Sequence, residues 1–163
     1  MVKRRSLLTG FLTAVVLAAF AGAASTVDAE PKLQLAVIVA KDSPISELSI
    51  YDLKRLYKGE TINAAGKRLV PLNLAPPATE RAAFDRVVLG MNPENIARYW
   101  IDRKIRGQSG PPKNIDSPDL LQRVVGRVDG AVGYVKFTEV RPDVKAIRID
   151  GKSPKDSGYP LTY

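Results

Sequence analysis

The sequence predicts an α/β domain in which helices cover a sheet. Short apolar runs rich in β-branched residues alternate with segments whose apolar residues recur at helical spacing. The connections between them are short and contain glycine, proline or asparagine. Alternating strands and helices with short connections are typical of a sheet flanked by helices, and residues 30–163 are enough for one such domain and its core.

The first half of this domain is expected to begin with a buried strand at residues 33–40. Ser49 and Asp52 then have the spacing of a capping box, with aspartate in place of the usual glutamate. Apolar residues at helical spacing follow until Gly59, which predicts a short amphipathic helix. A second strand is expected at residues 69–73.

Three helix starts are expected in the second half. Thr79 is expected to cap a helix that stops at Gly90. Asn92-Pro93 combines a good N-cap with proline at the first helical position. Asp116-Ser117-Pro118 starts a further helix. Two further strands complete the predicted elements, at residues 131–135 and 144–149.

Two aromatic residues and two glycines are assigned to packing rather than to a site. Tyr99 and Trp100 lie on the helix predicted after Pro93, and we expect them to close the core. Gly130 and Gly133 are expected to permit a tight turn and close backbone packing where the chain returns to the sheet.

The first 29 residues predict an export signal. Basic residues at positions 3–5 precede an apolar run at 7–21, and small residues that suit a cleavage site follow. The run falls short of the roughly 20 residues that span a bilayer, which favours a cleaved signal over a signal anchor. We therefore expect a signal peptide at residues 1–29 and a periplasmic domain at 30–163. The paired arginines leave twin-arginine export as an alternative.

The composition removes several classes of catalytic site. The 163-residue chain contains no cysteine and no histidine. The chain therefore lacks the residues needed for thiol catalysis and for hydrolysis of the Ser-His or Cys-His type. It also lacks the cysteine and histidine ligands that zinc sites prefer. No spacing singles out a catalytic pair among the acidic residues. We expect no enzyme activity and no cofactor.

The charge balance favours anionic partners. The chain has 25 basic and 17 acidic residues, a net charge of +8. The predicted signal peptide holds three of the basic residues and one of the acidic ones, so the domain remains basic. Such a balance can favour anionic ligands, anionic lipid head groups or nucleic acid. Because the basic residues are scattered rather than gathered with interleaved aromatics, we expect no nucleic-acid partner.

Five segments together resemble a known family. They are VIVAKDSPI at 37–45, FDRVVLGMNP at 84–93, YW at 99–100 with GQSGPP at 107–112, GAVGYV at 130–135 and GYPLTY at 158–163. In this order and spacing they resemble the small phosphate-type substrate-binding proteins of ABC transporters. The resemblance spans about residues 34–163 and implies a single periplasmic-binding-protein-like (type 2) lobe, with a mixed sheet flanked by helices. It also implies binding rather than catalysis, and a membrane permease or sensor protein as partner.

The resemblance places a candidate anion site at one helix start. The family's Ser-Gly-Thr-Arg loop presents hydroxyls and backbone N–H groups to the anion, and it aligns here with Ala78-Thr79-Glu80-Arg81. Arg81 would add a charge-assisted contact and Thr79 a hydroxyl. Glu80 opposes binding because it adds a carboxylate to the same turn. The alternative interpretation of these residues is helix capping with a solvated first turn.

Three further polar residues are candidate ligand contacts. Asn73 ends a predicted strand just before this loop. Ser43 and Ser109 lie in loops expected at a cleft edge. Ordinary turn chemistry explains each of them equally well.

Two functions remain open from the sequence. The first is an exported solute-binding-like protein that binds a small anion such as phosphate, weakly or with a partner. Full-length members of the family enclose the anion in a cleft between two lobes, so the resemblance implies that a second copy, forming a homodimer, or another chain would supply the missing wall of that cleft. The second is a periplasmic interaction or accessory module of a sensor or transport complex, which kept the fold and lost the ligand. The altered loop at residues 78–81 favours the second.

Overall fold

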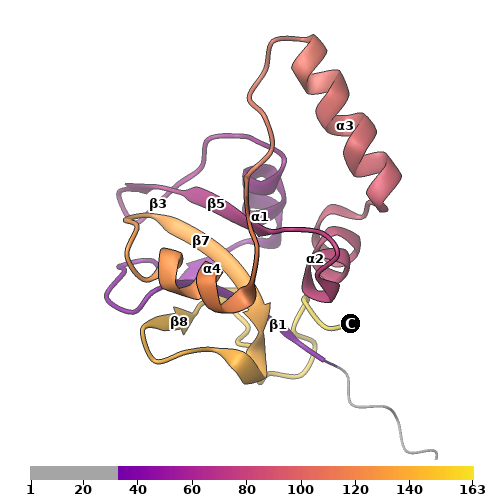
Figure 1. The fold of residues 1–163 in the computed structure, drawn as a ribbon. Helices are drawn as coiled ribbons and strands as arrows, with labels where there is room; N and C mark the ends of the chain where they lie inside the picture. Colours follow the sequence, from indigo (N-terminus) through magenta and orange to yellow (C-terminus); the bar gives the residue numbers. More distant parts are fainter. Residues whose placement is uncertain (1–32) are drawn as a thin grey trace, which may run out of the picture. The chain divides into compact units, whose positions relative to one another are not determined.

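A five-stranded mixed sheet forms the centre of residues 33–163, the part of the chain that the computed structural model describes (Figure 1). The predicted signal peptide lies outside the described residues. The strand order is β6-β5-β7-β1-β8. β5 runs parallel to β6 and β7, whereas β1 is antiparallel to β7 and β8. The strands are β1 (Leu35–Ala40), β5 (Val70–Leu74), β6 (Lys113–Ile115), β7 (Ala131–Lys136) and β8 (Val144–Ala146).

Helices cover both faces of this sheet, as the sequence predicts. α1 (Ile50–Tyr57) and α2 (Thr79–Phe84) pack on one face, and α2 continues as a π-helical turn at Asp85–Leu89. α4 (Pro118–Val125) packs on the opposite face, against β7. α3 (Pro93–Ile105) extends away from the sheet (Figure 1). The mixed α/β architecture is therefore confirmed.

Several of the shortest elements were not predicted. β2 (Glu47–Leu48) pairs in parallel with β9 (Arg148–Ile149), which is the end of the strand expected at residues 144–149. β3 (Asn63–Ala64) and β4 (Lys67–Arg68) form a hairpin where only a polar turn was expected. A single 3₁₀ turn follows β7, at Phe137–Glu139. Pairs of two-residue strands are too short to show a period in the sequence.

Two of the predicted helix caps are confirmed. Ser49 and Asn92 each accept a hydrogen bond from the backbone N–H three residues further on. Ser117 accepts the same kind of hydrogen bond at the start of α4, where no capping residue was predicted. The cap predicted at Thr79 is wrong, because Thr79 is the first helical residue and Ala78 is the N-cap, without a side-chain hydrogen bond. The start of α2 therefore depends on other groups for its free N–H donors.

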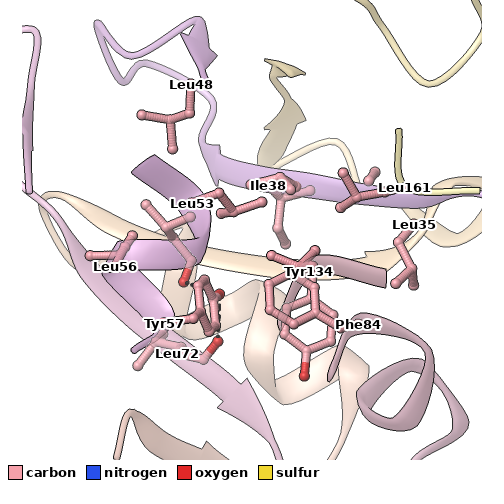
Figure 2. Close-up of a cluster of buried hydrophobic side chains, with 14 of the residues drawn as sticks. Leu35, Ile38, Leu48, Leu53, Leu56, Tyr57, Leu72, Phe84, Tyr134 and Leu161 are labelled. Carbon is pink, nitrogen blue, oxygen red and sulfur yellow. Dashed lines mark hydrogen bonds between the residues drawn. The ribbon is translucent and has the colours of Figure 1, made fainter. Parts of the chain in front are cut away.

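Three aromatic rings in contact fix α1 and α2 to the sheet (Figure 2). Tyr57, Phe84 and Tyr134 are fully buried, and burying one such side chain stabilises a fold by about 1.5–3 kcal/mol. Phe84 and Tyr134 stack with ring centroids 3.9 Å apart, and Tyr57 lies 4.5 Å from Phe84. The Tyr57 hydroxyl donates to the carbonyl oxygen of Leu72 at 2.9 Å. Burial raises the pKa of both tyrosine hydroxyls, so they remain neutral donors.

The two glycines assigned to packing have that role. A Cβ atom at Gly133 would lie 2.5 Å from Cδ2 of Leu121, so glycine lets α4 approach β7 closely. Gly130 has φ +73°, and a Cβ there would collide with the carbonyl oxygen of Arg68. Both expectations are confirmed.

The aromatic pair on α3 contributes less to the core than expected. Ile96 is the buried residue of this helix, whereas Tyr99 and Trp100 are half-buried. Trp100 packs against the edge of the core, but the Tyr99 hydroxyl donates to the carbonyl oxygen of Lys58 at 2.9 Å, at the end of α1. The prediction that Tyr99 closes the core is therefore wrong, because its ring lies at the surface between two helices.

The C-terminal tail returns to the start of β1. Leu33 and Tyr163 exchange two backbone hydrogen bonds, and the Leu35 N–H donates to the carbonyl oxygen of Leu161 at 2.9 Å. Tyr159 and Leu161 are buried, so the tail belongs to the core. Within residues 33–163, no helix combines the length and apolar character needed to cross a membrane.

Candidate functional site

Three of the five candidate residues, Asn73, Thr79 and Arg81, lie at or just after the C-terminal end of β5. β5 and β6 are parallel, with Asn73 opposite Asn114, so they end at the same edge of the sheet. The loop at 75–78 leads from β5 into α2. Ligands of open α/β sheets bind outside the carboxyl ends of parallel strands. The predicted anion site would therefore be formed by the groups at this edge of the sheet.

Arg81 is held by the chain itself. Its Nε donates to Oδ2 of Asp85 at 2.6 Å, and its Nη1 donates to the carbonyl oxygen of Leu74 at 3.0 Å and to Oδ1 of Asn114 at 3.3 Å. The Arg81 side chain is only 12% exposed. Most of its donors are therefore engaged inside the fold rather than presented to a free anion.

Asp85 is a functional candidate that the sequence reasoning missed. It is buried, at 5% exposed, and its Oδ1 has no hydrogen-bond partner among the described residues. Burial raises the pKa of Asp85, although the hydrogen bond and charge of Arg81 act in the opposite direction. The spacing of four residues from Arg81 on a predicted helix was the available signal.

Glu80 is buried at the start of α2 and has several hydrogen-bond donors around it. Its Oε1 lies 3.1 Å from Nζ of Lys136, and its Oε2 accepts from the Thr79 hydroxyl at 3.2 Å. Burial acts to raise the pKa of Glu80, but hydrogen bonds from its own backbone N–H and from Lys136 outweigh it, so the pKa is lowered. The expectation of a solvated first turn is wrong, because Glu80 is 5% exposed.

The Glu80 carboxylate therefore lies where the resemblance puts an external anion. A hydroxyl, a backbone N–H of the first turn and an ammonium group already surround it. These are the kinds of donor that attract anions to a helix start. A free anion would find these donors occupied and a carboxylate beside it.

Asn73 is directed into the core. The Tyr134 hydroxyl donates to its Oδ1 and also accepts a 3.4 Å hydrogen bond from the Leu74 N–H. Asn73 is 3% exposed, so its amide stabilises the buried C-terminal end of β5 and is not open to a ligand.

Ser43 and Ser109 lie at two other surface hollows, away from the cavity that Arg81 lines. The Ser43 hydroxyl accepts from the Ile45 N–H at 3.2 Å, as in an ordinary turn. The Ser109 hydroxyl donates to the carbonyl oxygen of Gly59 at 2.8 Å and accepts from Arg103 at 2.9 Å. Of the five candidate residues, only Thr79 and Arg81 lie on α2. The Thr79 hydroxyl and the Nε and Nη1 groups of Arg81 are engaged within the chain.

A cavity of about 500 Å³ opens beside Arg81 and Asp85. Its walls come from the loop before α2, from α2 with its π-helical turn, and from the first turns of α3. Apart from the two charged residues the lining is apolar, and it includes Pro76, Pro77, Ala82, Pro93, Ile96 and Ala97. Among residues 33–163, no group of three or more acidic side chains is placed to hold a metal ion.

Comparison with solved structures identifies the fold. No family model matches the sequence. An ABC-type phosphate transport receptor from Vibrio cholerae is 19% identical with a TM-score of 0.64, over 80% of this chain and 54% of the receptor. PstS from Borrelia burgdorferi is 9% identical with a TM-score of 0.61, over 80% of this chain and 55% of its own. The chain therefore has the periplasmic-binding-protein-like fold of phosphate-type substrate-binding proteins, over about half the length of these structures.

Proposed function

We propose that this chain is an exported, solute-binding-like protein of the periplasm that acts as an interaction module of a transport or sensor complex. In this proposal the lobe does not capture phosphate by itself. The observation that carries it is the buried Glu80 carboxylate, which the Thr79 hydroxyl and Lys136 contact at the start of α2.

The energetics support the loss of anion binding. A phosphate ion that reached these donors would have to displace Glu80 from Lys136 and would lie beside its carboxylate. Losing a hydrogen bond to a charged group of this kind costs about 1.5–3 kcal/mol. Nε of Arg81 already donates to Asp85, so Arg81 has fewer donors with which to offset this cost. Free phosphate therefore gains little from this edge of the sheet.

A second candidate is phosphate-like anion binding completed by another chain. The similarity to a phosphate transport receptor, of which this chain covers 54%, favours it. A second copy or a different protein would then supply the donors that Arg81 and Lys136 no longer offer. This candidate requires an assembly that forms only with the anion.

Calorimetric titration of the purified protein with phosphate and sulfate separates the two candidates. We expect no saturable heat up to millimolar anion. Two variants are compared, Arg81→Ala and Arg86→Ala, because Arg86 is an exposed arginine on the same helical segment. Saturable binding that Arg81→Ala removes and Arg86→Ala keeps would overturn the proposal. Gel filtration with phosphate completes the test, since a dimer that appears only with the anion would establish the second candidate.

The proposal also predicts that the chain binds a membrane protein. We expect the chain to co-purify with a membrane protein encoded beside its own gene. A sensor would place it in signalling, and a permease with its ATPase would place it in transport. Failure to bind any neighbouring membrane protein, together with saturable anion binding, would refute the interaction module.

A further inference from the structure

We propose that α3 and the loop after it bind the surface of a membrane that contains anionic lipids. We call the residues that make this contact the α3 surface, and they are Trp100, Ile101, Lys104, Ile105 and Pro111. The inference goes beyond the proposed interaction module, because the partner is a lipid bilayer rather than a membrane protein.

Two exposed isoleucines lie on one side of α3. Ile101 is 60% exposed and Ile105 is 79% exposed. Residues four apart lie one above the other on a helix, so the two side chains are neighbours. The other large apolar residues that are exposed within residues 33–163 lie singly on different elements or loops. A single exposed apolar residue is normal, whereas adjacent ones form the kind of patch that marks an interaction site.

The apolar surface continues from α3 onto the next loop. Trp100, Ile101 and Lys104 line a hollow of about 390 Å³ together with Pro111. Trp100 is half-buried, so its ring joins the edge of the core to the exposed Ile101. α3 extends away from the sheet (Figure 1), and no other element of residues 33–163 covers this side of it.

The charge around the α3 surface is positive. Residues 93–113 contain five basic and two acidic residues, so this short segment carries +3 of the net +6 of residues 33–163. Both acidic residues already pair with an arginine four residues further along α3. Arg103, Lys104 and Lys113 have no acidic partner in the described part of the chain. This charge attracts an anionic surface, whereas a second copy would bring two positive surfaces together.

The shape and composition of the α3 surface favour lipid over an acidic protein. An acidic protein would complement the charge, but it would need a groove shaped for Ile101 and Ile105. A bilayer accepts projecting apolar side chains without such a groove, while the ammonium group of Lys104 stays among the head groups and the indole ring of Trp100 lies at their boundary. Apolar residues with basic residues beside them are typical of helices that lie in the membrane interface. Because only two isoleucines are exposed, we expect weak, reversible binding that depends on salt.

The fluorescence of Trp100 tests this inference, because Trp100 is the only tryptophan of the chain. The purified protein is titrated with vesicles of equimolar phosphatidylglycerol and phosphatidylcholine, and with vesicles of phosphatidylcholine alone. We expect a saturable blue shift of the emission with the anionic vesicles and binding at least about tenfold weaker to phosphatidylcholine. Salt at about 1 M should also weaken the binding at least about tenfold, because it screens the lipid charge. No blue shift with either kind of vesicle, or equal affinity for both, would overturn the inference.

Two matched pairs of variants locate the contact. Ile105→Gln removes the most exposed apolar side chain of the α3 surface and should weaken binding to the anionic vesicles at least about fivefold. Leu120→Gln makes the same kind of change at an exposed residue of α4 and should leave binding unchanged. Lys104→Gln should weaken binding about fivefold, whereas Lys41→Gln removes the same charge at an exposed position outside α3 and should have no effect. Equal effects within either pair would overturn the inference.

A protein partner for α3 would give a different result. In that case the vesicles would leave the Trp100 emission unchanged, while Ile105→Gln would abolish co-purification with a membrane protein. This outcome would assign α3 to a protein interface and overturn the lipid inference. The vesicles contain no protein, so the fluorescence test can succeed or fail independently of the search for a membrane partner.

Discussion

Glu80 and Asp85 lie on one helical segment and are equally buried, at 5% exposed, but their pKa values move in opposite directions. Burial disfavours the charged form of both. Glu80 has contacts to both of its oxygens, whereas Asp85 has a partner for only one. The difference reflects both the desolvation of each carboxylate and the number of donors that contact it.

The same difference distinguishes the surroundings of Glu80 from those of Asp85. The donors near Glu80 are occupied by the chain's own carboxylate, so that end of α2 has little to offer an external anion. The Oδ1 oxygen of Asp85 has no hydrogen-bond partner in residues 33–163. One helical segment thus holds a carboxylate that is satisfied and another that is not.

The largest effect is expected from removing the partner of the less satisfied carboxylate. Arg81→Leu leaves Asp85 buried without a counter-charge and should lower the free energy of unfolding by about 3–5 kcal/mol. Arg86→Leu, at an exposed position of the same segment, should change it by less than about 0.5 kcal/mol. Urea unfolding followed by circular dichroism measures both. Similar small effects for the two variants would show that the pair with Asp85 is not important for stability.

A smaller effect is expected at the satisfied carboxylate. Glu80→Gln removes the charge that Lys136 contacts and should cost about 1.5–3 kcal/mol, the usual contribution of a hydrogen bond to a charged group. Glu139 also contacts Lys136, at 3.4 Å, but its side chain is 46% exposed. Glu139→Gln should therefore cost less than about 1 kcal/mol. Equal costs in urea unfolding would mean that the buried position of Glu80 contributes nothing special.

The sequence predicted the elements of the fold better than the contacts of the site. Helix caps such as Ser49 and Asn92 act within three residues, so a local pattern is enough to find them. β6 was missed because Lys113-Asn114-Ile115 contains a single apolar residue and shows no strand period. Its place in the sheet comes from pairing with β5, which a local pattern does not reveal.

The site residues were misjudged because their partners are distant in sequence. Asn73 looked like a strand-end residue open to a ligand, but Tyr134, at a separation of 61 residues, holds its amide in the core. The sequence suggested a solvated Glu80, but Lys136 pairs with it from the end of β7, the strand next to β5 in the sheet. The fold class depends on local periodicity and family resemblance, whereas side-chain burial depends on which strands become neighbours.

The smallest and most specific test of the comparison is the pH dependence of stability. The lowered pKa of Glu80 means that its contribution is present above the ordinary value of 4.5 and is lost as the pH falls through the folded-state value. The raised pKa of Asp85 has the opposite sign, so its protonation stabilises the fold below the ordinary value of 3.8, and this gain is lost as the pH rises through the folded-state value. In the wild type the two contributions partly cancel under acidic conditions.

The two isosteric amide variants should therefore change the acid response in opposite directions. Glu80→Gln should lose less stability than the wild type between about pH 6 and about pH 3.5, because the group whose protonation destabilises the fold is gone. Asp85→Asn should lose more over the same interval, because the compensating protonation is gone. Urea midpoints measured at several pH values give the two slopes. If both variants shift the slope in the same direction, then the two carboxylates share one environment, and the distinction between a satisfied and an unsatisfied carboxylate does not hold.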